Sequence, residues 1–178
     1  MKFSQAKLAG VWLIDLELRE DERGFLARTY CEKEFGAHGL NTRWPQCNLT
    51  LTRKRGMVRG LHYQADPHAE IKLIRCASGT VFDVVVDVCR KSPTFGRWEA
   101  FELSAENRRL LYVPEAFAHG FQCLSDNCEL FYQMSESYYP ELARGVRWND
   151  PDIGIQWPIA NPLVSERDKA LPPLSSLP

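Results

Sequence analysis

The sequence predicts an antiparallel double-sheet jelly roll, in which two packed sheets surround an interior that can hold a ligand. Short runs rich in β-branched and aromatic residues recur at near-regular spacing, and short turn segments such as "ASGT", "SAEN" and "LSDN" separate them. Helical periodicity is weak and is confined to residues 32–39 and 165–171. Many short strands with few helices favour a sandwich or a barrel over an α/β fold.

The expected strands follow one another along the whole chain. They are residues 10–18, 48–52, 69–79, 80–88, 97–104, 108–114, 119–125 and 128–135. Residues 56–64, "GMVRGLHYQ", form a further strand-like run that contains a glycine at its centre. The proline-rich end, "ALPPLSSLP", predicts a surface tail.

Residues 80–88, "TVFDVVVDV", show the period-2 pattern of a strand. One face is wholly apolar, whereas the other carries Asp83 and Asp87. We expect Asp87 to lie on a solvated sheet face. Asp83 has two interpretations: it is solvated as well, or it lies inside the barrel and orients a neighbouring cation or imidazole.

Composition limits the classes of protein to be considered. A chain of 178 residues fits one domain, residues 1–178. Its 44% hydrophobic and 25% charged residues and its net charge of -1 give no sign of disorder or of a nucleic-acid partner. Neither a membrane span nor a secretory signal is apparent, so we expect a cytoplasmic protein. The six cysteines lack C-x-x-C spacing and are expected to be reduced, mostly core-filling thiols.

The chemistry is expected at polar residues in strand-like contexts. No glycine-rich nucleotide loop and no serine-hydrolase motif occurs in the sequence. Buried cations are costly unless they meet an anion, so an anionic ligand is the simplest partner for such a set. Structural histidines in a barrel are the alternative for His62 and His119. The candidates are Arg59, His62, Lys72, His119, Tyr132 and Tyr138.

Arg59 and His62 have opposite parity along "VRGLH", so a regular strand would place them on opposite faces. They can share a pocket only if the strand bends or bulges. Gly60, which lies between them, is the residue that permits a bulge.

The sequence fits only part of the metal-binding pattern of cupin-type jelly rolls, which is G-x5-H-x-H and a later P-x-G-x2-H-x3-N. Gly56 and His62 fit the first part, but Gln64 replaces the second histidine, and Cys123 replaces the asparagine of the second part. One or two histidines rarely make a tight site. We therefore expect no metal.

Several ordered motifs carry a more specific resemblance. They are "DERGF", "Q-x-N" (Gln46, Asn48), "VRGLHYQ", "KLIRCASGTVFDVVVDV", "SPTFGRW", "VPEAFAHGF", "FYQMSESYYP", "RWNDP" with "IQWP", and "SERD". The chain resembles the dTDP-4-dehydrorhamnose 3,5-epimerase family over nearly its whole length. The resemblance implies a cupin-type jelly roll that needs no metal or other cofactor. Its substrate would be a 4-keto-6-deoxyhexose linked to a nucleoside diphosphate.

The resemblance also implies catalytic roles. His62 would be the base that removes a proton next to the C4 ketone, a task that suits a neutral imidazole. Asp168 would pair with this histidine, and Lys72 would stabilise the enolate oxygen. Tyr132 would be the acid that returns a proton to the opposite face.

The remaining expected site residues bind substrate. Arg23 and Arg59 match phosphate contacts, for which a planar guanidinium is well suited. Tyr138 matches an aromatic that stacks on the base, and His119 lines the pocket with Asp83 behind it. Gln46, Asn48 and Arg167 complete the set. The family further implies a homodimer in which the N-terminal region contributes to the sheet and the site of the partner.

Three residues depart from the family pattern: Arg28, Cys47 and Ala143. Arg28 and Ala143 occupy positions at which the family binds the nucleotide, so the resemblance predicts the base less well than it predicts the sugar. Inversion at only one of C3 and C5 stays open. Further alternatives are a sugar-nucleotide 3,4-ketoisomerase and a non-catalytic cupin that binds sugar nucleotides.

Overall fold

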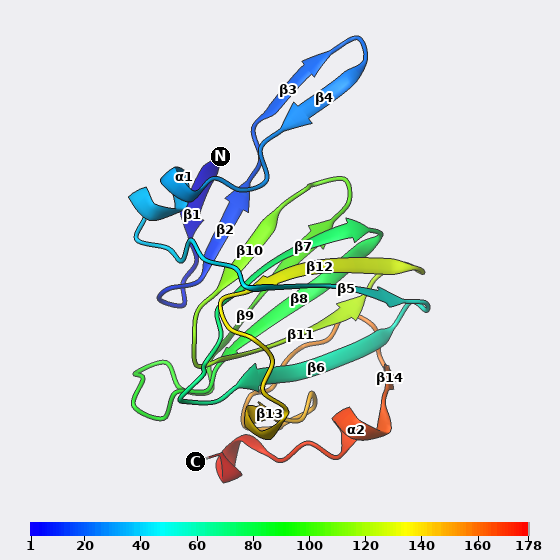
Figure 1. Ribbon diagram of the computed structural model, residues 1–178. Coiled ribbons are helices and arrows are strands. Elements are labelled where there is room, and N and C mark those ends of the chain that lie inside the picture. Colours follow the sequence, from blue (N-terminus) through cyan, green and yellow to red (C-terminus); the bar gives the residue numbers. More distant parts are fainter. Residues whose placement is uncertain (178) are drawn as a thin grey trace.

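The structure is a computed structural model that describes residues 1–177. Two six-stranded sheets face each other, which confirms the predicted jelly roll (Figure 1); the second includes the short strand β14 (Leu163–Val164), which lies off its main strand order. The first sheet consists, in spatial order, of β1 (Lys2–Gln5), β2 (Trp12–Asp15), β10 (Leu110–Val113), β7 (Lys72–Ser78), β12 (Cys128–Met134) and β5 (Gln46–Thr52). The second consists of β13 (Ala143–Gly145), β6 (Met57–Gln64), β11 (Phe117–Cys123), β8 (Thr80–Asp87) and β9 (Trp98–Ser104).

Neighbouring strands in both sheets pair antiparallel, and β14 (Leu163–Val164) adds a short parallel pairing to β6. The two expected helical regions are confirmed as α1 (Glu32–Ala37) and α2 (Glu166–Lys169). Two 3₁₀ turns, η1 (Pro140–Leu142) and η2 (Leu174–Ser176), complete the elements. No helix within residues 1–177 is long and apolar enough to cross a membrane.

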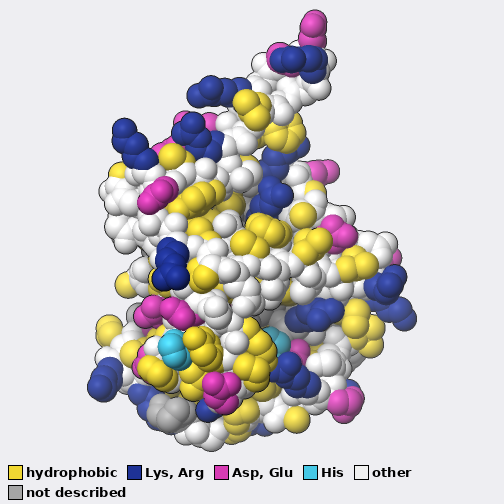
Figure 2. All heavy atoms as spheres, in the orientation of Figure 1, with side chains coloured by type: hydrophobic (Ala, Val, Ile, Leu, Met, Phe, Trp, Pro, Cys, Tyr) yellow, Lys and Arg dark blue, Asp and Glu magenta, His cyan; other side chains and the backbone are white. Residues whose placement is uncertain are grey.

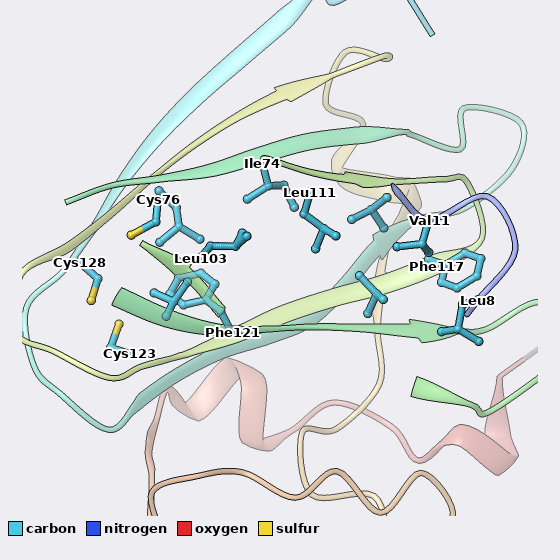
Figure 3. Packing of buried hydrophobic residues seen from close by; sticks show 14 residues of the cluster. Leu8, Val11, Ile74, Cys76, Leu103, Leu111, Phe117, Phe121, Cys123 and Cys128 are labelled. Atoms are coloured by element: carbon cyan, nitrogen blue, oxygen red, sulfur yellow. The ribbon is translucent and has the colours of Figure 1, made fainter. Parts of the chain in front are cut away.

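Apolar side chains from both sheets fill much of the interior (Figure 3). Ile74 and Leu130 enter from the first sheet, and Val85 and Phe121 enter from the second. All four are buried, as the period-2 patterns of their strands require. The polar residues of the interior lie outside this cluster, and several of them line a common cavity.

Each sheet also has a covered outer face. The N-terminal segment and α1 pack on the first sheet, where Phe35 meets Leu73 and Leu110. The C-terminal segment packs on the second sheet, where Ile153 and Leu174 belong to one cluster with the strand residues Leu61, Val84 and Val86. The predicted surface tail is therefore wrong, because Leu174 near the end of the chain is buried. Because the chain covers the second sheet in this way, α2 comes to lie beside β6 (Figure 1).

The prediction for Asp87 is wrong, because its carboxylate is buried and not solvated. It accepts hydrogen bonds from the Cys89 N–H and from the hydroxyls of Ser92 and Thr94, and so holds the loop after β8. For Asp83 the interior interpretation is confirmed, since its side chain is 0% exposed and contacts His119. The apolar face of β8 packs against the C-terminal segment.

The strand expected at residues 10–18 is shorter than predicted and is followed by a separate hairpin. β3 (Leu18–Asp21) and β4 (Gly24–Ala27) form this hairpin, which projects from the body of the molecule (Figure 1). Figure 2 shows charged side chains at its tip and hydrophobic side chains nearer the body. Leu26 is 70% exposed and Phe25 is exposed as well, so the hairpin has apolar surface without cover in the single chain.

All six cysteines are free. Cys76, Cys123 and Cys128 are buried in the core, whereas Cys31 and Cys89 are partly exposed and Cys47 is exposed. Burial raises the pKa of Cys76 and Cys123 to about 12, so these thiols behave as apolar core groups.

Candidate active site

The strand β6 bulges at Gly60, as a shared pocket for Arg59 and His62 requires. Across the β6–β11 ladder, His62 faces His119 and Arg59 faces Phe121, so three steps on β6 match two on β11. Gly60 has a φ of 115°, a conformation that side chains with a Cβ rarely adopt. The extra residue reverses the parity beyond it, and Arg59 and His62 then line the same cavity.

This cavity has a volume of about 240 Å³, and all four expected catalytic residues line it. His62 and His119 enter from the second sheet, whereas Lys72 and Tyr132 enter from the first. Its full lining is Arg59, His62, Lys72, His119, Gly120, Phe121, Tyr132, Ser165, Arg167 and Asp168.

His62 and Asp168 form a hydrogen-bonded pair, with 2.7 Å between His62 Nε2 and Asp168 Oδ1. The other carboxylate oxygen accepts the Gly60 N–H at 3.1 Å, so the bulge itself helps to hold the acid. Ser165 caps α2 by accepting the Asp168 N–H. Burial acts to raise the pKa of the Asp168 carboxyl, but the hydrogen bond and charge of His62 bring it below its usual value. Asp168 is therefore an ionised partner, and the second ring nitrogen of His62 is left for a ligand.

His119 forms a second pair, with 2.8 Å between its Nε2 and Asp83 Oδ1. Asp83 lies on β8, deeper in the interior, and its Oδ2 has no hydrogen-bond partner in the part of the chain that the structure describes. Burial raises the pKa of Asp83 against the opposing charge of His119. The two pairs therefore differ: burial outweighs the other contributions to the pKa of Asp83, whereas at Asp168 the hydrogen bonds and neighbouring positive charge together outweigh burial.

Lys72 and Tyr132 are held on the first sheet by side chains that the sequence prediction did not include. The Lys72 ammonium pairs with Glu70, and both side chains are largely buried. The Tyr132 hydroxyl donates to Thr50 Oγ1 at 3.1 Å. Burial raises the pKa of Tyr132, so its phenol is protonated at neutral pH. A protonated phenol and an imidazole thus face the cavity from opposite sheets.

Two arginines give the mouth of the cavity positive charge. Arg59 donates from Nε to Thr52 Oγ1 at 2.9 Å and from a terminal nitrogen to the Leu51 carbonyl at 3.3 Å. Arg167 lines the cavity from α2 and is exposed. Guanidinium groups at this position suit an anionic ligand such as a phosphate.

The expected substrate-binding residues Gln46, Asn48 and Tyr138 lie near the cavity but do not line it. Asn48 is the cross-strand partner of Tyr132. Gln46 Oε1 accepts the Tyr138 N–H at 2.9 Å, and the Tyr138 side chain is exposed. Arg23 lies at the tip of the β3–β4 hairpin, where its 84% exposed side chain pairs with Asp21 and does not reach the cavity of its own chain.

The three departures from the family pattern also lie outside the cavity lining. Arg28 pairs with Glu34 at 2.6 Å beside the N-terminus. Cys47 is exposed on β5, and Ala143 pairs with Gln64 across the β13–β6 ladder.

Gln64, at the position of the second cupin histidine, has a structural role. Its buried amide donates to the carbonyls of His68 and Ser137 and accepts the Tyr139 N–H. Within residues 1–177, no three His, Cys, Asp or Glu side chains come close enough together to hold a metal ion.

Sequence reasoning missed Thr50, Thr52, Glu70 and Ser165 as partners of the site residues. A signal for the two threonines is present in "QCNLTLT", residues 46–52, where polar residues occupy every second position. For Glu70 the signal is its spacing of two from Lys72, which puts both on one strand face.

Comparison with known proteins agrees with this geometry. The family model described as dTDP-4-dehydrorhamnose 3,5-epimerase matches residues 5–176. The enzyme of that name from Shigella flexneri is 43% identical over 169 residues, covering 94% of this chain and 93% of the relative.

Solved structures extend the likeness to three dimensions. The dTDP-4-dehydrorhamnose 3,5-epimerase of Elizabethkingia anophelis NUHP1 has a TM-score of 0.94 at 39% identity, covering 98% of this chain and 97% of that one. The dTDP-6-deoxy-D-glucose-3,5-epimerase of Legionella pneumophila Philadelphia 1, solved with dTDP-4-keto-L-rhamnose, has a TM-score of 0.93 at 33% identity, covering 99% and 94%. The fold, the ordered motifs and the full-length matches agree: the chain belongs to the dTDP-4-dehydrorhamnose 3,5-epimerase family.

Proposed function

We propose that His62, Lys72 and Tyr132 carry out the 3,5-epimerisation of a dTDP-linked 4-keto-6-deoxyhexose in the cavity between the two sheets. The chain is an isomerase of this family, and its substrate class follows from the relatives. One observation supports the assignment of roles above all others. The His62–Asp168 pair and the Tyr132 hydroxyl enter one cavity from opposite sheets, so a sugar ring between them has a base on one face and an acid on the other.

Proton removal comes first. The C4 ketone acidifies the hydrogens on C3 and C5, because the negative charge left on either carbon is shared with the ketone oxygen. His62 takes the proton with the ring nitrogen that Asp168 does not hold. The ionised Asp168 stabilises the imidazolium that results, and a positioned base of this kind is worth roughly 10²–10⁴-fold in rate.

The charge that develops on the ketone oxygen then needs a donor. Lys72 supplies an ammonium on the first sheet, and Glu70 holds it in place. His119, held by Asp83, faces the same cavity and is assigned to substrate binding. An oxyanion donor typically contributes roughly 3–4 kcal/mol to the transition state.

Reprotonation completes the inversion. Tyr132 gives its phenolic proton to the carbon from the face opposite His62, so the configuration changes. If His62 returned the proton, the original configuration would be restored. The same pair of residues serves C3 and C5 in turn, because both carbons neighbour the one ketone.

The wild-type protein in deuterated water tests this proposal. Incubation with dTDP-4-keto-6-deoxyglucose, followed by NMR, should place deuterium at C3 and C5 and give the inverted sugar. Substrate recovered without deuterium and without inversion would rule out the epimerase mechanism.

A dimer is the second part of the proposal, in which the β3–β4 hairpin of one chain carries Arg23 to the diphosphate in the partner's cavity. Two surfaces of the single chain support it. The hairpin exposes Phe25 and Leu26, and the edge strand β5 exposes Leu49 and Leu51 on its outer side. Apolar surface of this kind, next to an unpaired strand edge, is typical of an interface between chains.

Sedimentation of the wild type and of Leu26→Asp tests the dimer. The wild type should sediment as a dimer, and the variant should shift toward the monomer with a higher KM. A monomeric wild type with full activity would contradict the proposed role of the hairpin.

A further inference from the structure

The edge strand β5 has an unusual polarity. Its outer side carries Cys47, Leu49 and Leu51, which are exposed, whereas its inner side is polar. Thr50 and Thr52 lie on the inner side, since they face the buried Leu130 and Cys128 across the β5–β12 ladder. A strand at the edge of an apolar interior ordinarily shows the reverse pattern. The inner threonines therefore need a reason other than packing.

Each inner threonine holds one residue of the site. The Tyr132 hydroxyl donates to Thr50 Oγ1 at 3.1 Å, and Arg59 Nε donates to Thr52 Oγ1 at 2.9 Å. One strand thus supports both the acid and a phosphate-binding arginine. Spacing by two residues is what allows a single strand to do so, because positions 50 and 52 share a face.

We infer that Thr50 is the positioning residue for the acid, and that it supports Tyr132 both before and after the proton leaves. This inference rests on the proposed role of Tyr132 as the proton donor. Before transfer, the Thr50 oxygen accepts the phenolic hydrogen and fixes the direction of the O–H bond. After transfer, Tyr132 is a phenolate, and the Thr50 hydroxyl turns to donate its own hydrogen to that oxygen. A hydroxyl can play both parts because it is donor and acceptor at once.

The atoms balance in this step. The phenolic proton forms the new C–H bond on C3 or C5, the O–H electrons remain on the tyrosine oxygen, and the enolate collapses to the ketone. The phenolate then regains a proton from water. Burial disfavours the charged phenolate and raises the pKa of Tyr132, whereas the hydrogen bond to Thr50 acts in the opposite direction.

Loss of the Thr50 hydroxyl should therefore slow reprotonation and leave proton removal intact. The enolate would then recover its proton from His62 more often, which gives deuterium exchange without inversion. Hydrogen bonds to charged groups are worth about 1.5–3 kcal/mol, so the ratio of inversion to exchange should fall by roughly ten- to a hundredfold.

The experiment compares Thr50→Val with Thr50→Ser, which retains the hydroxyl. Both are incubated with dTDP-4-keto-6-deoxyglucose in deuterated water, and NMR follows exchange and inversion separately. Thr50→Val should lower the ratio, and Thr50→Ser should restore it to within a few-fold of the wild type. Thr52→Val should instead raise KM, because it loses the contact with Arg59. If Thr50→Val does not fold, Thr50→Ala is measured in its place.

Tyr132→Phe separates this inference from the function on which it rests. If Tyr132→Phe loses inversion but Thr50→Val keeps the wild-type ratio, the role of Thr50 is overturned while that of Tyr132 stands. If Tyr132→Phe inverts at the wild-type rate, the assignment of Tyr132 as the acid fails first. A low ratio in Thr50→Ser equal to that of Thr50→Val would also overturn the inference, because the hydroxyl would then not matter.

Discussion

The bulge at Gly60 gives a prediction for both stability and activity. In Gly60→Ala the new Cβ would lie 2.6 Å from the Gly120 Cα and 2.8 Å from the His119 carbonyl oxygen. Both contacts are with backbone, which cannot move aside as the end of a flexible side chain can. The φ of 115° at this position is also one that alanine rarely adopts.

These two effects set the expected magnitude. Backbone strain at such a φ costs about 1–3 kcal/mol, and overpacking in a close-packed region costs about 1–3 kcal/mol. Together they predict a loss of about 2–6 kcal/mol in the free energy of unfolding, which is a large part of the 5–15 kcal/mol typical of a domain. Relief of the clash would move β6 away from β11, and Arg59 and His62 would no longer face the same cavity. We therefore expect kcat/KM to fall by at least about tenfold even in the fraction that folds.

Urea unfolding and steady-state kinetics measure the two effects. Gly39→Ala is the matched control, because Gly39 also has a positive φ, 69°, but no atom lies within 4 Å of its added Cβ. The control should lose about 1 kcal/mol and keep its activity. A Gly60→Ala protein as stable and as active as Gly39→Ala would refute the claim that the bulge builds the site.

The carboxylates of Asp168 and Asp87 and the ammonium of Lys72 give further predictions. In Asp168→Asn, kcat should fall about a hundredfold or more. The pKa of Asp168 is lower in the folded protein than in the unfolded chain, so the stability that its charge contributes is present above about pH 4 and is lost as the pH falls through the folded-state pKa. Below that pKa, the free energies of unfolding of variant and wild type, measured in urea, should converge. Lys72→Met should lower kcat by about 10²–10³ with a smaller change in KM, and equal losses in kcat and substrate affinity would argue for a binding role. Asp87→Ala should lose about 3 kcal/mol in the free energy of unfolding with unchanged kcat, because two hydroxyls and the Cys89 N–H lose their acceptor. A free energy of unfolding equal to that of the wild type would contradict the inference that Asp87 holds the loop after β8.

Strands were predictable from the sequence where the two-residue alternation of side chains matches the way the two faces of the strand are packed. In β8 the residues pack alternately on the two sides of the sheet, Val81 and Val85 in the interior and Val84 and Val86 against the C-terminal segment, as the period-2 pattern predicts. The β3–β4 hairpin was missed because nearly all its residues are exposed, so burial imposes no alternation on it. Asp87 was misplaced because its partners, Ser92 and Thr94, lie in a loop, and period-2 reasoning does not extend beyond the strand.

The spacing of residues in the sequence does not predict which distant side chains come into contact at the site. His62 and Asp168 lie 106 positions apart, and no spacing rule joins them; the resemblance to a family did. Gly60 was different, because parity alone required a bulge if Arg59 and His62 were to share a pocket, and the register shift confirms it. Alternation in the sequence predicts that Thr50 and Thr52 share one face of β5. Their hydrogen bonds to Tyr132 and Arg59 depend on which side chains of β12 and β6 lie next to that face.

In the proposed mechanism, His62 removes a proton on one face of the sugar and Tyr132 returns one on the other. The most direct measurement is deuterium exchange at C3 and C5 of dTDP-4-keto-6-deoxyglucose catalysed by His62→Asn, compared with Tyr132→Phe under the same conditions. Exchange in His62→Asn should fall by about 10² or more at both carbons, whereas Tyr132→Phe should continue to exchange without inverting. Exchange at the wild-type rate in His62→Asn would contradict the account.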